Sequence, residues 1–129
     1  MNTKLVMTIS SVILGIMGIL LSSVPLEISK YLEMSESNLI ILQILGALYL
    51  GFAMLNWTAK ANLIGGIYSR PVAIANFTHF LIGGLALVKL GFKNVGLTYI
   101  WIALIVYAIF AILFAVVLFT SPVSKEKSI

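Results

Sequence analysis

The side chains in this sequence that could do chemistry are Asn56, Asn76, His79, Lys60 and Arg70. Asn56, Asn76 and His79 interrupt long apolar stretches, where polar and ionisable groups are costly and mark candidate functional sites. His79 could accept or donate a proton, ligate a metal or haem, or hydrogen-bond a polar substrate headgroup. Lys60 and Arg70 lie at the ends of the same stretches and could hold an anionic headgroup such as that of a phospholipid.

A structural role is the alternative for the three uncharged members of this set. Asn56 and Asn76 lie at similar depths on the second and third apolar stretches of the chain, spans 2 and 3, and His79 lies about one turn deeper. The three could therefore hydrogen-bond one another across these two spans. Interhelical bonds of this kind contribute only about 0.6–2 kcal/mol each, yet they fix the register of the helices. We keep both interpretations for these residues.

Several kinds of chemistry lack the residues they need. The chain has one histidine, no cysteine and no aspartate. A single histidine supplies one metal ligand where zinc takes three or four, and haem bound by His79 alone would need a second chain or a vacant axial position. Because there is no aspartate, hydrolysis by a Ser/His/Asp set is excluded. A proton-coupled carrier would want a carboxylate inside an apolar stretch, and all four acids lie outside these stretches. We therefore expect no catalytic residues, no metal and no cofactor.

The composition requires lipid as the solvent for most of the chain. Of 129 residues, 61% are hydrophobic and 9% are charged, and the mean hydropathy is +1.15. Soluble domains carry about 25% charged residues. The length fits a single transmembrane domain over residues 1–129. The net charge of +4 is spread over loops and tails and forms no basic face, so we expect a bilayer and no nucleic acid as the partner.

Four apolar stretches are long enough to cross a bilayer, at about 5–24, 38–59, 71–88 and 95–120. They predict an all-α fold, an integral membrane four-helix bundle with antiparallel helices. The first stretch could be read as a signal peptide, but its run of about twenty residues exceeds the usual core of about 7–15, and we expect a true span.

The connecting segments carry further signals. The segment 25–38 alternates apolar and charged residues after Pro25, which predicts a short interfacial helix between spans 1 and 2. Ser35 or Ser37 could then cap span 2. Gly65 and Gly66 are typical of a turn. Residues 89–94 are predicted to form a tight turn with two lysines.

Small residues predict where the spans pack. Close backbone approach through small side chains is how helices associate in lipid, where the hydrophobic drive is weak. At 100° per residue, the helical wheel gives one small-residue stripe on span 1, which contains Thr8, Ser11, Gly15, Gly18 and Ser22. Span 2 has two stripes: one contains Gln43, Gly46, Ala47, Leu50, Met54 and Trp57, and the other contains Tyr49, Ala53, Asn56 and Lys60. Gly46 and Ala47 permit close packing, and Trp57 and Lys60 are expected to anchor the span at the headgroups.

The distribution of basic residues predicts the orientation. Five basic residues lie on the side of the membrane that holds both termini: Lys4, Lys60, Arg70, Lys125 and Lys127. Three lie on the other side: Lys30, Lys89 and Lys93. The positive-inside rule then places both termini in the cytoplasm.

The pattern Leu45-Gly46-Ala47-Leu48, then Gly51 and Asn56-Trp57, after a loop that begins with Pro25, resembles many small four-span bacterial membrane proteins of uncharacterised function. The resemblance covers about half of the chain and implies four helices and an inner-membrane location. Small multidrug transporters have a glutamate in the first span and quinone-linked disulfide enzymes need cysteines, and this chain has neither. Residues 76–80 are similar to the third span of fluoride channels, but the other motifs of that family are missing.

Three function classes follow. The leading one is a non-enzymatic membrane protein, a scaffold or partner subunit that self-associates or joins another membrane protein and holds a lipid-like ligand between its spans. The second is a small oligomeric permease or channel that uses the face of Asn56, Asn76 and His79. An enzyme on lipid substrates ranks last.

Overall fold

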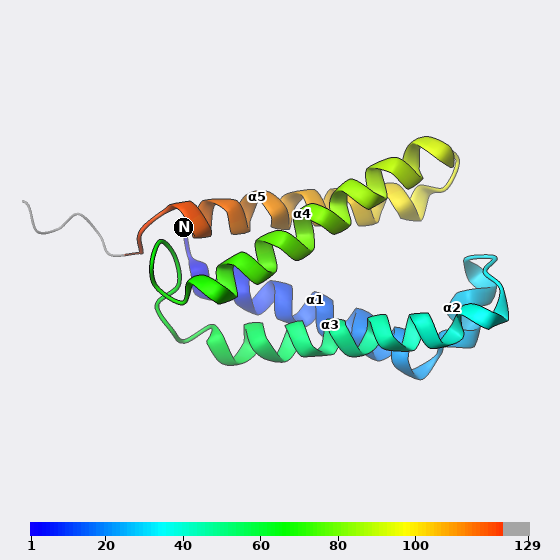
Figure 1. The fold of residues 1–129 in the computed structure, drawn as a ribbon, viewed down its shortest axis with the longest axis horizontal. Coiled ribbons are helices and arrows are strands. Elements are labelled where there is room, and N and C mark those ends of the chain that lie inside the picture. The colour runs from blue at the N-terminus through cyan, green and yellow to red at the C-terminus, as the bar shows by residue number, and fades with distance from the viewer. Residues whose placement is uncertain (123–129) are drawn as a thin grey trace, which may run out of the picture. The chain divides into compact units, whose positions relative to one another are not determined.

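The fold is all-α, as predicted, and is built from two compact units. The structure is a computed structural model that describes residues 1–122, with the side chain of Glu36 excepted. The units comprise Met1–Ala61 and Asn62–Ile129, and each is described by itself. The first contains α1 (Thr3–Ser23), α2 (Pro25–Tyr31), the 3₁₀ helix η1 (Glu36–Asn38) and α3 (Leu39–Ala59), and the second contains α4 (Arg70–Lys93) and α5 (Thr98–Phe119) (Figure 1).

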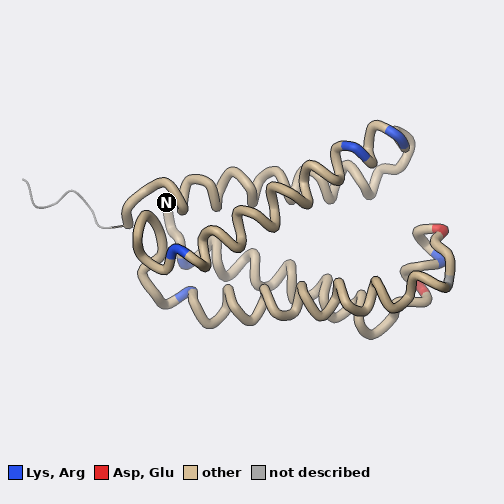
Figure 2. The backbone as a smooth tube through the Cα atoms, viewed as in Figure 1, with Lys and Arg blue, Asp and Glu red and all other residues tan. Residues whose placement is uncertain are grey.

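Four helices, α1, α3, α4 and α5, are each long and apolar enough to cross a membrane, which indicates a multi-pass membrane protein. Charged residues gather at the helix ends and in the connecting segments of both units (Figure 2). The short helix α2 begins at Pro25, as the sequence predicts, because proline fits the first turn, where its missing N–H is not needed.

In the first unit, α1 and α3 form an antiparallel pair with a seam of alternating three- and four-residue spacing (Figure 1). This spacing of about 3.5 residues per turn keeps one face of each helix on its partner along the whole length. The buried seam residues are Met7, Ser11, Leu14, Gly18 and Leu21 on α1, and Leu42, Gly46, Ala53 and Asn56 on α3.

The closest approach of this pair is at Gly18 and Gly46. A Cβ added to Gly18 would lie 2.9 Å from the Gly46 carbonyl oxygen, and one added to Gly46 would lie 2.9 Å from the Gly18 carbonyl oxygen. Near the other end, the Ser11 hydroxyl donates to the Ala53 carbonyl over 2.7 Å. These contacts confirm the packing face predicted on span 1.

The seam of α3 takes residues from both stripes predicted on span 2. Gly46 of the first stripe and Ala53 and Asn56 of the second are buried, whereas Met54 of the first stripe is 62% exposed. The helical wheel assumed 3.6 residues per turn, whereas a paired helix follows a repeat near 3.5, so the two diverge by about 20° per heptad.

Two predictions about the connecting segments are wrong. Residues 89–93 continue α4 as a helix and the turn comes only after Asn94, whose backbone N–H bonds to the Leu90 and Gly91 carbonyls. The lysines there end the apolar run but not the helix, because lysine is a good helix former. The hydroxyls of Ser35, just before η1, and Ser37, within it, hydrogen-bond each other, and α3 has no side-chain cap.

In the second unit, α4 and α5 form an antiparallel pair joined by an aromatic core. Phe80 of α4 stacks on Phe110 and Phe114 of α5, with ring centroids 4.9 Å and 5.7 Å apart. The loop before α4 makes the predicted turn at Gly65 and Gly66, and two backbone hydrogen bonds of 2.9 Å join Gly65 to Tyr68.

Candidate functional site

Asn56 is part of a polar clamp between α1 and α3. Its side chain is fully buried, and its Nδ2 donates to the Ser10 hydroxyl oxygen over 2.9 Å. The Ser10 hydroxyl in turn donates to the Met7 carbonyl over 3.0 Å. Lipid cannot satisfy such groups, so a chain of hydrogen bonds between the two helices is the way to bury them. The sequence singled out Asn56 but missed Ser10, whose only signal was its place beside Ser11 in an apolar run.

Asn76 is also fully buried. Its Nδ2 donates to the Val72 carbonyl one turn earlier on α4, over 3.0 Å. A bond to the residue four positions earlier satisfies the amide within its own helix. This contact needs no ligand and supports a structural role for Asn76.

His79 lies near the middle of α4, opposite a tyrosine of α5. Its Nε2 is 3.3 Å from the Tyr107 hydroxyl, and the two ring centroids are 5.5 Å apart. When Nδ1 carries the proton, Nε2 accepts this hydrogen bond, and in the other tautomer Nε2 donates to the phenol oxygen. The pair therefore joins two groups that can each give or take a proton at the level of the bilayer interior.

Glycine makes this pairing possible. A Cβ added to Gly83 would lie 2.5 Å from Cε1 of Tyr107, so the tyrosine ring lies directly on the α4 backbone one turn after His79. Phe80 contacts the same ring edge-on, with centroids 5.2 Å apart. The sequence singled out His79 but missed Tyr107 as its partner. Tyrosines of membrane proteins usually lie near the headgroups, so the position of Tyr107 deep inside a span was the signal that could have identified it.

Lys60 and Arg70 lie at helix ends, as predicted. The Lys60 Nζ lies over the Trp57 ring at 2.9 Å from its centroid, a cation–π contact at the end of α3. Arg70 begins α4, and its Nη1 donates to the Gly66 carbonyl over 3.5 Å. Both cations thus have a partner within their own unit, and their role in holding an anionic headgroup stays a prediction.

The structure brings Asn76 and His79 together on α4 and attaches Asn56 to α1 through Ser10. The predicted hydrogen bonding of spans 2 and 3 would join the two units and stays a prediction. Within residues 1–122, no group of three or more His, Cys, Asp or Glu side chains is placed to hold a metal ion.

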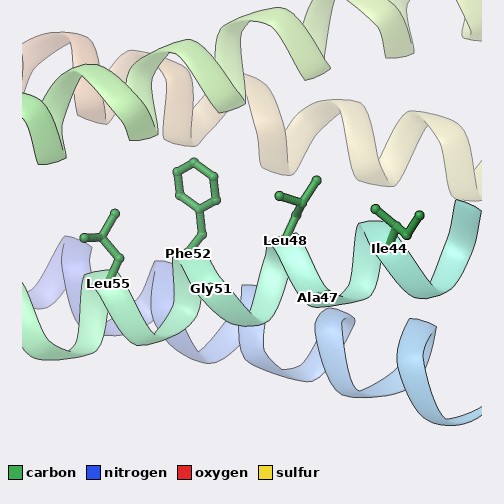
Figure 3. Close-up of a pocket in the computed structure, with 6 residues that line it drawn as sticks. All are labelled: Ile44, Ala47, Leu48, Gly51, Phe52 and Leu55. Carbon is green, nitrogen blue, oxygen red and sulfur yellow. The ribbon is translucent and has the colours of Figure 1, made fainter.

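One further surface stands out on α3, on a face other than the seam. An open, apolar groove of about 540 Å³ is lined by residues of this helix alone: Ile44, Ala47, Leu48, Gly51, Phe52 and Leu55. Figure 3 shows the large side chains of this set rising from one side of the helix, with Ala47 and Gly51 between them. A Cβ added to Gly51 would meet nothing within 4 Å. We call this surface the α3 groove.

Comparison of the sequence with protein-family models and with curated proteins, and of the fold with solved structures, finds no match in any of the three.

Proposed function

We propose that this multi-pass membrane protein is non-enzymatic and acts by pairing with another transmembrane helix, as a scaffold or partner subunit. The observation that carries the proposal is the α3 groove, a second face of small residues on a helix that already uses one such face against α1. The partner that fits best is a second copy of the chain, which would bring an identical groove.

The seam of the first unit indicates how this chain uses small residues. At Gly18 and Gly46, two helices approach until no Cβ would fit between them. In the groove, Ala47 and Gly51 are two small residues four positions apart, a small-xxx-small pair. Pairs with this spacing let helix backbones approach closely in lipid. Leu48 and Leu55, 57% and 36% exposed, lie seven residues apart and would form a ridge along one side of a docked helix.

The proposed setting is the inner membrane of a bacterium, with both termini in the cytoplasm. The excess of basic residues on the side of the termini supports this orientation. A lipid-like ligand along the apolar groove is the alternative occupant, since an acyl chain would also fit an apolar surface of this length.

Cysteine crosslinking in native membranes tests the pairing, because the chain has no cysteine of its own. Leu55→Cys lies in the groove, and Met54→Cys is its matched control, one residue away and about 100° around the helix at the same depth. We expect oxidation to give a dimer of 14.0 kDa chains for Leu55→Cys and a monomer for Met54→Cys.

Two results would contradict this proposal: equal dimer yields from both variants, or only monomer from both. Native mass spectrometry from mild detergent distinguishes the alternative occupant. A mass above a whole number of chains would identify a retained ligand in place of a helix.

A small oligomeric permease is the second candidate, and the His79–Tyr107 pair favours it, because a proton acceptor and a hydroxyl meet inside a span. The test is pH-dependent flux in liposomes. Flux that vanishes in His79→Ala supports a permease, and unchanged flux removes His79 from any transport mechanism.

A further inference from the structure

Helix α4 continues past the end of its apolar run. Its 24 residues give about 36 Å at 1.5 Å per residue, more than the roughly 30 Å of a bilayer core. Arg70 and Lys89 are about 28 Å apart along this helix, which matches the thickness of the core. We therefore expect Lys89 at the boundary of the hydrocarbon and Lys93 one turn further out, at the depth of the headgroups.

Two lysines and an aromatic ring share one side of this final part of α4. At 100° per residue, Lys89, Phe92 and Lys93 fall within an arc of about 100°. Gly91 lies on the opposite side, where an added Cβ would be 3.4 Å from the Trp101 ring of α5. The two lysines therefore lie on the side of α4 away from Gly91, and Phe92, at the edge of the arc nearest Gly91, is 72% exposed.

The aromatic part of this surface is held in place by α5. The Trp101 indole N–H donates to the Val95 carbonyl over 3.1 Å. The Phe92 ring meets the Trp101 ring edge-on, with centroids 6.0 Å apart and planes at 88°. Aromatic rings at headgroup depth are usual in membrane proteins. Here the contact with Trp101 holds Phe92, which shares its arc of α4 with the two lysines.

The same arc continues towards the middle of α4 as an apolar stripe. Ile82 and Leu85 lie on it and are 59% and 53% exposed. The rise from Leu85 to Lys89 is about 6 Å, so apolar surface gives way to positive charge within about one turn. An amphiphile with a negative head and an apolar tail has the complementary arrangement.

We propose that this face of α4 binds an anionic phospholipid of the surrounding bilayer. The phosphate lies between Lys89 and Lys93, and an acyl chain follows Ile82 and Leu85. Charge complementarity supports this occupant, because residues 62–122 contain Arg70, Lys89 and Lys93 and no acid at all. The site is independent of the α3 groove, so the failure of either proposal leaves the other standing.

Fluorescence of Trp101 provides the test, since this ring contacts Phe92, the aromatic member of the proposed site. The chain has two tryptophans, so Trp57→Phe leaves Trp101 as the sole reporter. The variant is reconstituted into vesicles of zwitterionic phosphatidylcholine with a minor fraction of phosphatidylglycerol. Bromine, which quenches tryptophan, is carried on the acyl chains of the phosphatidylglycerol in one sample and of the phosphatidylcholine in the other.

We expect quenching by the brominated phosphatidylglycerol to exceed its mole fraction in the vesicle. In Lys89→Gln/Lys93→Gln the quenching should fall to the level set by that mole fraction. Each lysine contributes roughly 1 kcal/mol near an anionic surface, so the affinity for the lipid should fall about fivefold per lysine removed. Lys89→Arg/Lys93→Arg should keep the excess, because the charge is retained. Lys30→Gln, an exposed lysine of α2, is the matched control and should also keep it.

Three results would overturn the proposal. Quenching of the Trp57→Phe protein that follows the mole fraction shows no site. An excess that survives Lys89→Gln/Lys93→Gln shows that these lysines do not hold the lipid. An equal loss in Lys30→Gln shows attraction to the protein surface in general. Far-UV circular dichroism checks that each variant keeps its helices.

Discussion

The seam of the first unit makes a sharp prediction about one substitution at two positions of α3. Gly46→Ala places a Cβ 2.9 Å from the Gly18 carbonyl oxygen and 2.9 Å from the Ser22 backbone nitrogen. Neither atom belongs to a flexible side-chain end, so α1 and α3 must move apart. Gly51→Ala places its Cβ in open space. The gain in helix propensity, about 0.5–1 kcal/mol, is the same for both and cancels in the comparison.

The difference between the two variants is therefore the cost of overpacking, about 1–3 kcal/mol. We expect Gly46→Ala to lower the free energy of unfolding relative to Gly51→Ala by this amount. Far-UV circular dichroism during titration of detergent-solubilised protein with sodium dodecyl sulfate measures it. Equal stability of the two variants would refute the reasoning, because it would mean that the helices do not approach closely at Gly46.

The remaining predictions concern single contacts, each measured by the same titration. Gly83→Ala should displace the Tyr107 ring and cost about 1–3 kcal/mol, whereas Gly84→Ala, with a Cβ 3.8 Å from the same residue, should be tolerated; equal effects would contradict the close contact. Gly65→Ala should cost about 1–3 kcal/mol, since its φ of 131° strains any other residue, and a neutral result would exclude that backbone conformation. Asn56→Ala should cost about 1–2 kcal/mol through loss of its 2.9 Å bond to a buried serine, and unchanged stability would argue against the clamp.

The sequence alone determined the fold class and the number of spans. Long apolar runs interrupted by short charged segments have one solution in lipid, because every backbone N–H and C=O must be satisfied within the segment. The same reasoning located α2 after Pro25, the turn at Gly65 and the packing face of α1 at Gly18. These features depend on local propensity or on residue size, which can be read from one segment at a time.

The end of α4 and the face of α3 were decided only by the tertiary structure. Hydropathy marks where a helix leaves the hydrocarbon, but a helix ends where its hydrogen bonds end, and that point is Asn94. The face of α3 that holds Ala53 and Asn56, and exposes Trp57, follows the 3.5-residue repeat that pairing with α1 imposes.

The partners of the candidate site residues were also beyond the sequence. The polarity of Asn56 and His79 in apolar runs showed that each must find a hydrogen bond. The sequence did not show that the partners are Ser10 and Tyr107, 46 and 28 positions away. A contact between residues on different helices depends on the register and separation of those helices, and packing around glycine sets both.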